Sequence, residues 1–248
     1  MKILLPPSES KRPGGDDAAL DLGALALPRL RPQREAVVDA LVALSADRDA
    51  ARRVLKLSAR QLGDIDANRM LRTAPTMPAV DRYTGVLYDA LGADALGEAA
   101  RRWLGAHVLI HSAPLGPIGA LDPIPAYRLA AGTSLPGIPP LRRFWADAVT
   151  ASLAEAAFVL DLRSEAYVAL GPVPASVPSA YVRVVTASGR ALNHFNKRSK
   201  GELVRSLAGD PPPAGSGLDE LIAWGAAHGW TLRPEPGSGG VVDLVIPG

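Results

Sequence analysis

The chain has 248 residues, of which 48% are hydrophobic and 21% are charged. These values are ordinary for a folded globular protein and exclude a disordered chain, a collagen-like repeat and a disulfide scaffold. The net charge is only +2 although the sequence pI is about 9.0, and the absence of cysteine excludes thiol catalysis and thiolate metal sites. No apolar run has the length of a membrane helix or signal peptide, so we expect a cytoplasmic protein with no membrane partner.

Apolar spacing predicts the secondary structure over most of the chain. In chain order it predicts a strand at 2–5, a helix at 33–44, short helices at 49–72, a helix at 94–104, a strand at 107–111, a helix at 141–157, strands at 158–162 and 181–186, a basic helix at 197–207, a helix at 218–228 and a strand at 241–246. The stretch 113–140 is rich in Gly and Pro and has no periodicity, which is typical of a functional or disordered loop.

The order of these elements indicates the fold class. Strands and helices alternate, but without the even spacing of a barrel or a doubly wound sheet. We therefore expect an α/β (α+β) fold, with residues 1–248 forming a single compact domain that has a mixed sheet and surrounding helices. A segment rich in Pro and Gly at 209–217 predicts a flexible linker before the last helix and strand.

Basic side chains are concentrated in two segments. The first contributes Arg52, Arg53, Lys56 and Arg60, and the second contributes Lys197, Arg198, Lys200 and Arg205, next to His194 and Phe195. Such clusters contact the phosphates of nucleic acids, and a helix N-terminus adds to the attraction for anions. A charged run is also the usual composition of a solvated helix face, so the pattern alone leaves both interpretations open.

Three other segments carry mixtures of polar side chains. They hold Ser8, Glu9, Ser10 and Lys11 after the first strand, then Asp122, Tyr127 and Arg128 in the proline-rich loop, then Asp161, Arg163, Ser164, Glu165 and Tyr167 after a buried strand. Loops that leave the carboxyl ends of strands are where α/β proteins bind ligands. Hydroxyls, carboxylates and an ammonium group can bind an anion or carry acid–base chemistry. The alternatives are a solvated turn for the first segment and an internal salt-bridge network for the last.

The four histidines do not form a metal motif. His107 and His111 share a face of their predicted strand, but no third ligand follows nearby in the sequence. We therefore predict no metal site and no cofactor, and iron binding by scattered histidines and carboxylates is the weakest functional hypothesis.

Six motifs follow one another over residues 1–207. They are KILLPPSESK at 2–11, YTGVLY at 83–88, LGPI at 115–118 with LDPIPAYRL at 121–129, FW at 144–145, DLRSEAY at 161–167 and KRSKG at 197–201. Taken together and in this order, they resemble the peroxide stress protein YaaA family.

The resemblance implies a cytosolic bacterial protein that supports survival of hydrogen peroxide by limiting the damage caused by free iron. It also implies one compact α/β fold with a helix–hairpin–helix and a positively charged cleft that binds duplex DNA. The hairpin would fall at residues 51–72, with 57–68 as its core. Gly63 suits a tight turn there, but a second glycine is missing, and Asp64 and Asp66 add negative charge where phosphate would lie.

Two functional hypotheses follow. In the first, the protein binds duplex or structured DNA through the eight basic side chains and protects it from peroxide. In the second, it is an enzyme acting on a nucleotide, nucleobase or other small anionic substrate, with Lys11, Asp122 and Glu165 as catalytic groups. Acid–base chemistry needs particular groups in fixed places, whereas phosphate contacts tolerate exchange among basic residues. The second hypothesis therefore expects the polar segments to converge on one cleft, which would be lined by Ser8, Ser10, Tyr83, Tyr127, Arg128 and Arg163.

Overall fold

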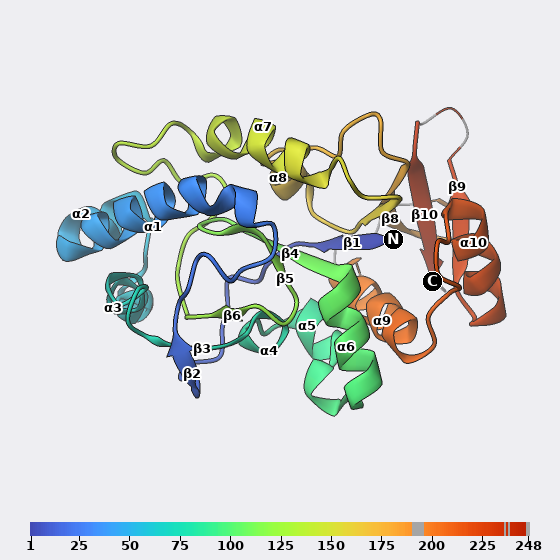
Figure 1. Cartoon of the computed structure of the whole chain (residues 1–248), viewed down its shortest axis with the longest axis horizontal. Coiled ribbons are helices and arrows are strands. Elements are labelled where there is room, and N and C mark those ends of the chain that lie inside the picture. Colours follow the sequence, from blue (N-terminus) through green and yellow to red (C-terminus); the bar gives the residue numbers. More distant parts are fainter. Residues whose placement is uncertain (190–195, 236, 238, 247–248) are drawn as a thin grey trace.

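A computed structural model describes residues 1–189, 196–235, 237 and 239–246 (Figure 1). The described residues form a main sheet with the strand order β5-β4-β1-β7-β8-β10-β9. Its strands are β1 (Lys2–Leu5), β4 (Val108–Ser112), β5 (Gly116–Gly119), β7 (Val159–Asp161), β8 (Ser179–Thr186), β9 (Thr231–Pro234) and β10 (Val241–Ile246). The inner strands run parallel, and β5 and β9 close the two edges as antiparallel strands. The expected mixed α/β fold in a single compact domain is confirmed.

The position of β1 in this sheet explains where a ligand can bind. The two strands that form parallel pairs with β1, namely β4 and β7, lie on opposite sides of it. The chain therefore reverses its direction of travel across the sheet at β1. In open α/β sheets, ligands bind beyond the carboxyl ends of the strands at such a switch point. A ligand site is therefore expected at the loops that leave β1 and β7.

Helices cover the sheet, and a small second sheet lies beside it. The helices are α1 (Arg31–Ala46), α2 (Arg48–Val54), α3 (Gly63–Arg69), α4 (Ala79–Arg82), α5 (Val86–Leu91), α6 (Glu98–His107), α7 (Leu141–Leu153), α8 (Glu165–Val168), α9 (Asn196–Gly209) and α10 (Leu218–Ala227), with 3-10 turns η1 (Pro28–Leu30), η2 (Ala59–Gln61) and η3 (Ala93–Ala95). The small antiparallel sheet joins β2 (Asp17–Ala19), β3 (Pro75–Pro78) and β6 (Pro123–Ile124). In Figure 1, α7 lies above the central strands, and α5, α6 and α9 lie below them.

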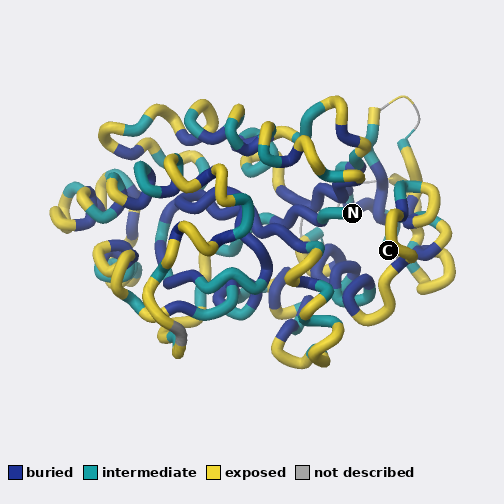
Figure 2. Tube along the Cα trace, viewed as in Figure 1, coloured by how far each residue is buried: buried dark blue, intermediate teal, exposed yellow. Residues whose placement is uncertain are grey.

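Burial explains why these sequences form these elements. Ile3, Leu4 and Leu5 of β1 are fully buried, as expected for a parallel strand covered on both faces. On α7 the buried residues Leu141, Trp145, Val149 and Leu153 recur every fourth position and form one stripe. Figure 2 shows the same division over the molecule, with buried central strands and exposed outer helix turns.

The structure differs from the predicted elements mainly where segments are short. The helix expected at 94–104 begins only at Glu98, after η3, and the loop expected at 113–140 contains β5 and β6. The segment expected as a linker at 209–217 joins α9 to α10, and within it Ser216 is buried and the carbonyl of Asp210 accepts a hydrogen bond from Trp224 Nε1. β5 and β6 have four and two residues and consist largely of Gly and Pro, so they show neither a period nor an apolar run, which is why apolar spacing did not reveal them.

Close packing of α9 on α5 depends on Gly201. A Cβ atom at this position would lie 2.1 Å from the backbone oxygen of Leu87 and 3.0 Å from Cβ of Ala90. Because a backbone carbonyl cannot rotate away as a side chain can, Gly201→Ala must push the two helices apart. Overpacking of this kind costs about 1–3 kcal/mol, occasionally more. We therefore expect Gly201→Ala to lower the free energy of unfolding in urea by at least the middle of that range.

Gly209 is the matched control for this prediction because it ends the same helix, and a Cβ atom added there would have nothing within 4 Å. Gly209→Ala should leave the urea midpoint nearly unchanged. Equal midpoints for the two variants would contradict the proposed role of Gly201.

Candidate functional site

A cleft of about 910 Å³ lies beyond the carboxyl ends of β1 and β7. This volume is in the range of pockets that hold small molecules. Its walls come from segments far apart in the sequence: residues 6–10 after β1, 84–88 at the start of α5, 130–132, 162–167 after β7, Tyr181 of β8, and Asn196, Lys197 and Lys200 of α9. The parallel arrangement of β1 and β7 brings the first and fourth of these segments together.

Some of the residues that the sequence predicted for the functional site line the cleft, and others do not. Those that line it are Ser8, Ser10, Arg163, Glu165, Lys197 and Lys200. Lys11, Tyr83, Asp122, Tyr127 and Arg128 are not among the lining residues. Pro6, Thr84 and Tyr181 also line it, although the sequence did not mark them as site residues. Pro6 and Thr84 lie inside the quoted motifs at 2–11 and 83–88, and Tyr181 begins the strand predicted at 181–186, and these are the signals that could have identified them.

Lys11 lies behind the loop that forms one wall. Its ammonium donates hydrogen bonds to the carbonyl oxygens of Ser8 (3.0 Å) and Glu9 (3.3 Å) and lies 4.0 Å from the ring centre of Tyr127. Burial, together with the nearby charge of Arg128, lowers the pKa of Lys11 to about 7. Lys11 therefore braces the loop from within, and its donors are used by the loop rather than offered to the cleft.

A chain of buried hydroxyls lies next to Lys11. The hydroxyls of Tyr83 and Tyr127 are 2.6 Å apart, and Ser112 Oγ donates to the Tyr127 hydroxyl at 2.9 Å. Burial raises the pKa of both tyrosines well above the ordinary value, so both stay neutral. Arg128 reaches the same loop from outside and pairs with Glu9 at 2.7 Å. These contacts hold the 6–11 loop in a fixed position against the cleft.

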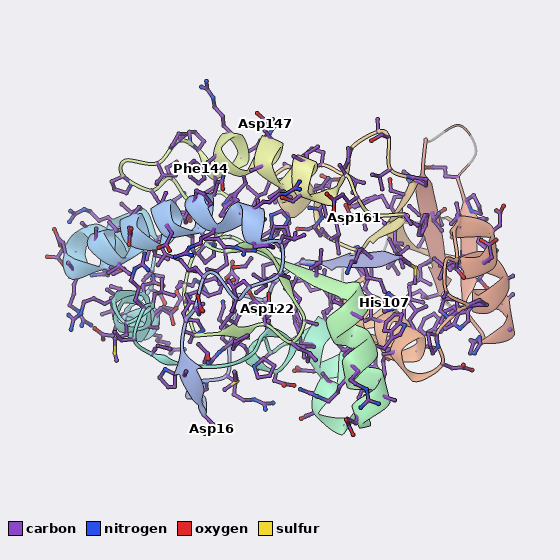
Figure 3. All side chains as sticks on the ribbon, in the orientation of Figure 1. Asp16, His107, Asp122, Phe144, Asp147 and Asp161 are labelled. Atoms are coloured by element: carbon purple, nitrogen blue, oxygen red, sulfur yellow. The ribbon has the colours of Figure 1, made fainter. Side chains whose placement is uncertain are left out.

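Asp122, expected as a catalytic group, lies outside the walls of the cleft and bonds to backbone. Its Oδ2 accepts hydrogen bonds from the backbone nitrogens of Ala26 and Gly119, each at 2.7 Å. Burial raises its pKa. Figure 3 shows Asp122 and Asp161 in separate regions of the molecule. These two hydrogen bonds tie the loop between β2 and η1, which contains Ala26, to the last residue of β5.

Arg163 and Asp161 form a buried ion pair beneath the cleft. The Nε and Nη2 atoms of Arg163 donate to the two carboxylate oxygens of Asp161 at 2.9 and 2.6 Å. Arg163 Nη1 donates to the carbonyl of Gly171 (2.9 Å) and to His111 Nδ1 (2.8 Å). Burial and the charge of Arg163 lower the pKa of His111 well below its ordinary value, so the imidazole is neutral. This is the internal salt-bridge network that the sequence left as an alternative, and it fixes the strand end that carries Ser164 and Glu165.

Lys200 is buried in the wall of the cleft. Only 4% of the residue is exposed, and its ammonium lies 5.7 Å from the ring centre of Tyr181. No other described residue forms a hydrogen bond or ion pair with that ammonium, and the nearby Asp161 already binds Arg163 with both oxygens. Burial lowers the pKa of Lys200 to about 8. The cleft therefore contains an amine that the rest of the described fold does not use.

The other basic residues do not share this cleft. Arg52, Arg53, Lys56 and Arg60 are exposed on α2, η2 and the turn between them, and Figure 1 shows α2 at the left end of the molecule, away from α9, which lies right of its centre. In the part of the chain that the structure describes, none of these four side chains forms an ion pair. On α9, Arg205 donates to the carbonyls of Leu91 and Gly92, and Arg198 pairs with Glu202. His194 and Phe195 lie outside the described residues.

The histidines do not gather with other metal-binding side chains. Within the described ranges, no three His, Asp or Glu side chains are grouped so that they could hold a metal ion. His107, expected as the first residue of a strand at 107–111, is instead the last residue of α6, and its Nδ1 lies 2.9 Å from the backbone oxygen of Met1. No helix in those ranges is both long and apolar enough to cross a membrane.

Comparison with known proteins identifies the family. The chain is 45% identical to a UPF0246 protein of Corynebacterium efficiens, over 99% of this chain and 100% of that protein. It is 43% identical to a UPF0246 protein of Streptomyces coelicolor, over 90% and 89% of the two chains, and 32% identical to one from Streptococcus pneumoniae over 52% and 51%. The family model described as peroxide stress protein YaaA matches residues 1–232, which confirms the resemblance seen in the sequence motifs. The chain therefore belongs to the peroxide stress protein YaaA family, and this membership supports a role in peroxide stress.

Proposed function

We propose that the cleft binds a small anionic ligand, such as a nucleotide, and that the protein acts on this ligand as an enzyme. The observation that carries this proposal is Lys200, whose buried ammonium faces a ligand-sized cleft and has no counter-ion of its own among the described residues. A buried charge without a partner costs free energy, and a bound anion would remove that cost.

The other walls suit a ligand with a polar end and an apolar end. Ser8, Ser10 and Ser164 offer hydroxyls, and the exposed carboxylate of Glu165 is available for proton transfer. Pro6, Pro7, Val86 and Leu87 form an apolar surface on the same cleft, against which a ring can pack. Val86 remains 54% exposed, which is unusual for a large apolar side chain in this chain.

Ligand titration tests this proposal. We expect inorganic phosphate and adenosine monophosphate to bind wild-type protein in calorimetry, and Lys200→Met to weaken that binding by at least about tenfold, because a hydrogen bond to a charged group contributes about 1.5–3 kcal/mol. Lys56→Met removes a lysine on the distant turn after α2 and should leave binding unchanged. Equal affinities for wild type and Lys200→Met, or no binding of either anion, would contradict the proposal.

Duplex DNA is a second candidate ligand, at a different surface. The observation that favours it is the group of four exposed basic side chains, Arg52, Arg53, Lys56 and Arg60, without ion pairs to described residues. They lie on two short helices joined by a turn, and such groups bind phosphates without base specificity. By covering DNA, this surface would limit the damage that iron and peroxide cause to it.

Salt dependence distinguishes the DNA surface from the cleft. Each phosphate contact contributes a slope of about −0.9 to log K against log salt. We therefore expect replacement of Arg52, Arg53, Lys56 and Arg60 by alanine to weaken duplex binding and to make this slope shallower by up to about 3.6. A Lys197→Ala/Lys200→Ala variant should keep the wild-type slope. The reverse pattern would place DNA in the cleft, and no binding at low salt would exclude this second function.

Protection of plasmid DNA from nicking by ferrous iron and peroxide should follow duplex affinity across the same variants.

A further inference from the structure

The amine most available to a ligand is not the one that the sequence suggested. Lys11, which is partly buried, has a lower pKa than Lys200, but its ammonium donates to two loop carbonyls and lies over aromatic rings. Lys200 lines the cleft, and its ammonium lies over the ring of Tyr181 and has no hydrogen bond or ion pair with a described residue. Nucleophilic attack requires a nitrogen lone pair that can point at the ligand, and of these two lysines only Lys200 meets that condition.

The surroundings of Lys200 lower its pKa enough for the free amine to be populated beside the ammonium near neutral pH. The residue is almost fully buried, and Asp161, the one carboxylate of the described residues that influences its charge, is already bound on both oxygens by Arg163. With a pKa of about 8, about a tenth of Lys200 is unprotonated at pH 7. An exposed lysine of ordinary pKa has roughly a thousandth or less of its amine free at this pH. Desolvated lysines of this kind form Schiff bases with carbonyl substrates.

The same cleft holds groups for the rest of the ligand. Glu165 lines it with an exposed carboxylate that pairs with no described side chain. Lys197, one turn earlier on α9, also lines it and brings an exposed ammonium. Ser8 and Ser164 add hydroxyls from two other walls. A ligand that fits must therefore place an electrophilic carbon at Lys200 and an anionic group at Lys197 and the hydroxyls.

We infer that Lys200 forms an imine with a ligand that carries an aldehyde or ketone together with a phosphate or carboxylate group. This inference rests on the proposed function, because it assigns a reaction to the same cleft. The neutral Lys200 amine attacks the carbonyl carbon and the C–O π bond breaks. Glu165 carries one of the two nitrogen protons to the alkoxide oxygen, which gives a neutral carbinolamine. Glu165 then carries the second nitrogen proton to the hydroxyl, which makes it a leaving group. Water departs and the C=N bond forms, with no change in oxidation state.

Reductive trapping tests the inference. Pyridoxal 5′-phosphate serves as the probe because it combines an aldehyde with a phosphate, and borohydride then converts any imine to a stable secondary amine. The chain has five lysines, so peptide mass mapping can follow each of them. At pH 7 we expect Lys200 to be modified at least about tenfold faster than the exposed Lys56, in line with its larger share of free amine. Pyridoxal, which lacks the phosphate, should modify Lys200 more slowly, and inorganic phosphate should compete with the phosphorylated probe.

A Lys200→Arg variant separates the two roles of this residue. Arginine keeps a cation in the cleft but cannot form a reducible imine, so fast modification should disappear while inorganic phosphate still binds. Modification confined to Lys56, Lys197 and other exposed amines of the wild type would overturn the inference. If phosphate still bound in that case, and bound more weakly to Lys200→Met, the proposed anion site would be supported and only the imine would be excluded. If phosphate did not bind and Lys200 remained unmodified, both the anion site and the imine would be excluded.

Discussion

Asp161→Asn is expected to lower the free energy of unfolding by about 3–5 kcal/mol, the usual cost of removing one partner of a buried ion pair. Arg163 is fully buried, and its guanidinium donates to both carboxylate oxygens of Asp161. The amide that replaces the carboxylate carries no charge and has only one oxygen to accept these hydrogen bonds. The variant therefore leaves a positive charge in the core with its counter-charge removed. Urea unfolding at pH 7 measures the loss.

Asp147 provides the matched control for Asp161. It lies on α7, is exposed, and has no ion pair with any residue in the described ranges, and Figure 3 shows both side chains. Asp147→Asn removes the same charge from the surface and should change the free energy of unfolding by less than about 0.5 kcal/mol. A similar small effect for Asp161→Asn would show that the buried pair does not hold the end of β7, and that Ser164 and Glu165 are positioned by other contacts.

Apolar patterning predicted the core of the fold because the long elements repeat a period. The strand at 241–246 and the start of the helix at 141–157 agree with β10 and α7, and the basic helix at 197–207 corresponds to α9. The elements that were not predicted have no such repeating apolar pattern. β6 consists of Pro123 and Ile124 alone, and α8 has four residues, so their structure depends on contacts with distant parts of the chain. Pairing of β1 with β7 is also non-local and is not readable from the spacing of apolar residues.

The sequence predicted the cleft better than it predicted the roles of single residues. Polar segments that follow strands were expected to meet, and the loops after β1 and β7 do meet, because parallel neighbours place their carboxyl ends together. Composition cannot show which side of a loop a side chain occupies. Lys11 lies inside its loop and Asp122 bonds to backbone, whereas Lys200, which the sequence grouped with the phosphate-contacting residues of a basic helix, is buried in the wall of the cleft. The direction in which a side chain points, and how far it is buried, are set by contacts with distant parts of the folded chain.

Lys200→Met is expected to stabilise the protein at neutral pH even though it removes the residue on which the cleft depends. Methionine fills a similar volume without a charge to desolvate. The pKa of Lys200 is about 8 in the folded protein and near 10.4 in an unfolded chain, a difference worth about 3 kcal/mol below pH 8. Part of that gain is lost with the contact to Tyr181, so we expect an increase of about 1–3 kcal/mol in the free energy of unfolding at pH 7.

The dependence of this gain on pH identifies its cause. The unfolded state binds more protons than the folded state between about pH 8 and 10.4, so the wild type gains stability as the pH rises through this interval. Lys11, whose pKa is also lowered, contributes a slope of the same sign to both proteins and cancels in the difference. The advantage of Lys200→Met should therefore be full at pH 7, shrink from about pH 8 upward, and nearly vanish by about pH 10. Lys197→Met, at an exposed position on the same helix, should give no such curve.

A gain that stayed constant over this range would mean that better packing, not relief of a buried charge, stabilises the variant. A gain that shrinks, combined with loss of anion binding, is the pattern expected when a protein keeps a destabilising lysine for its function.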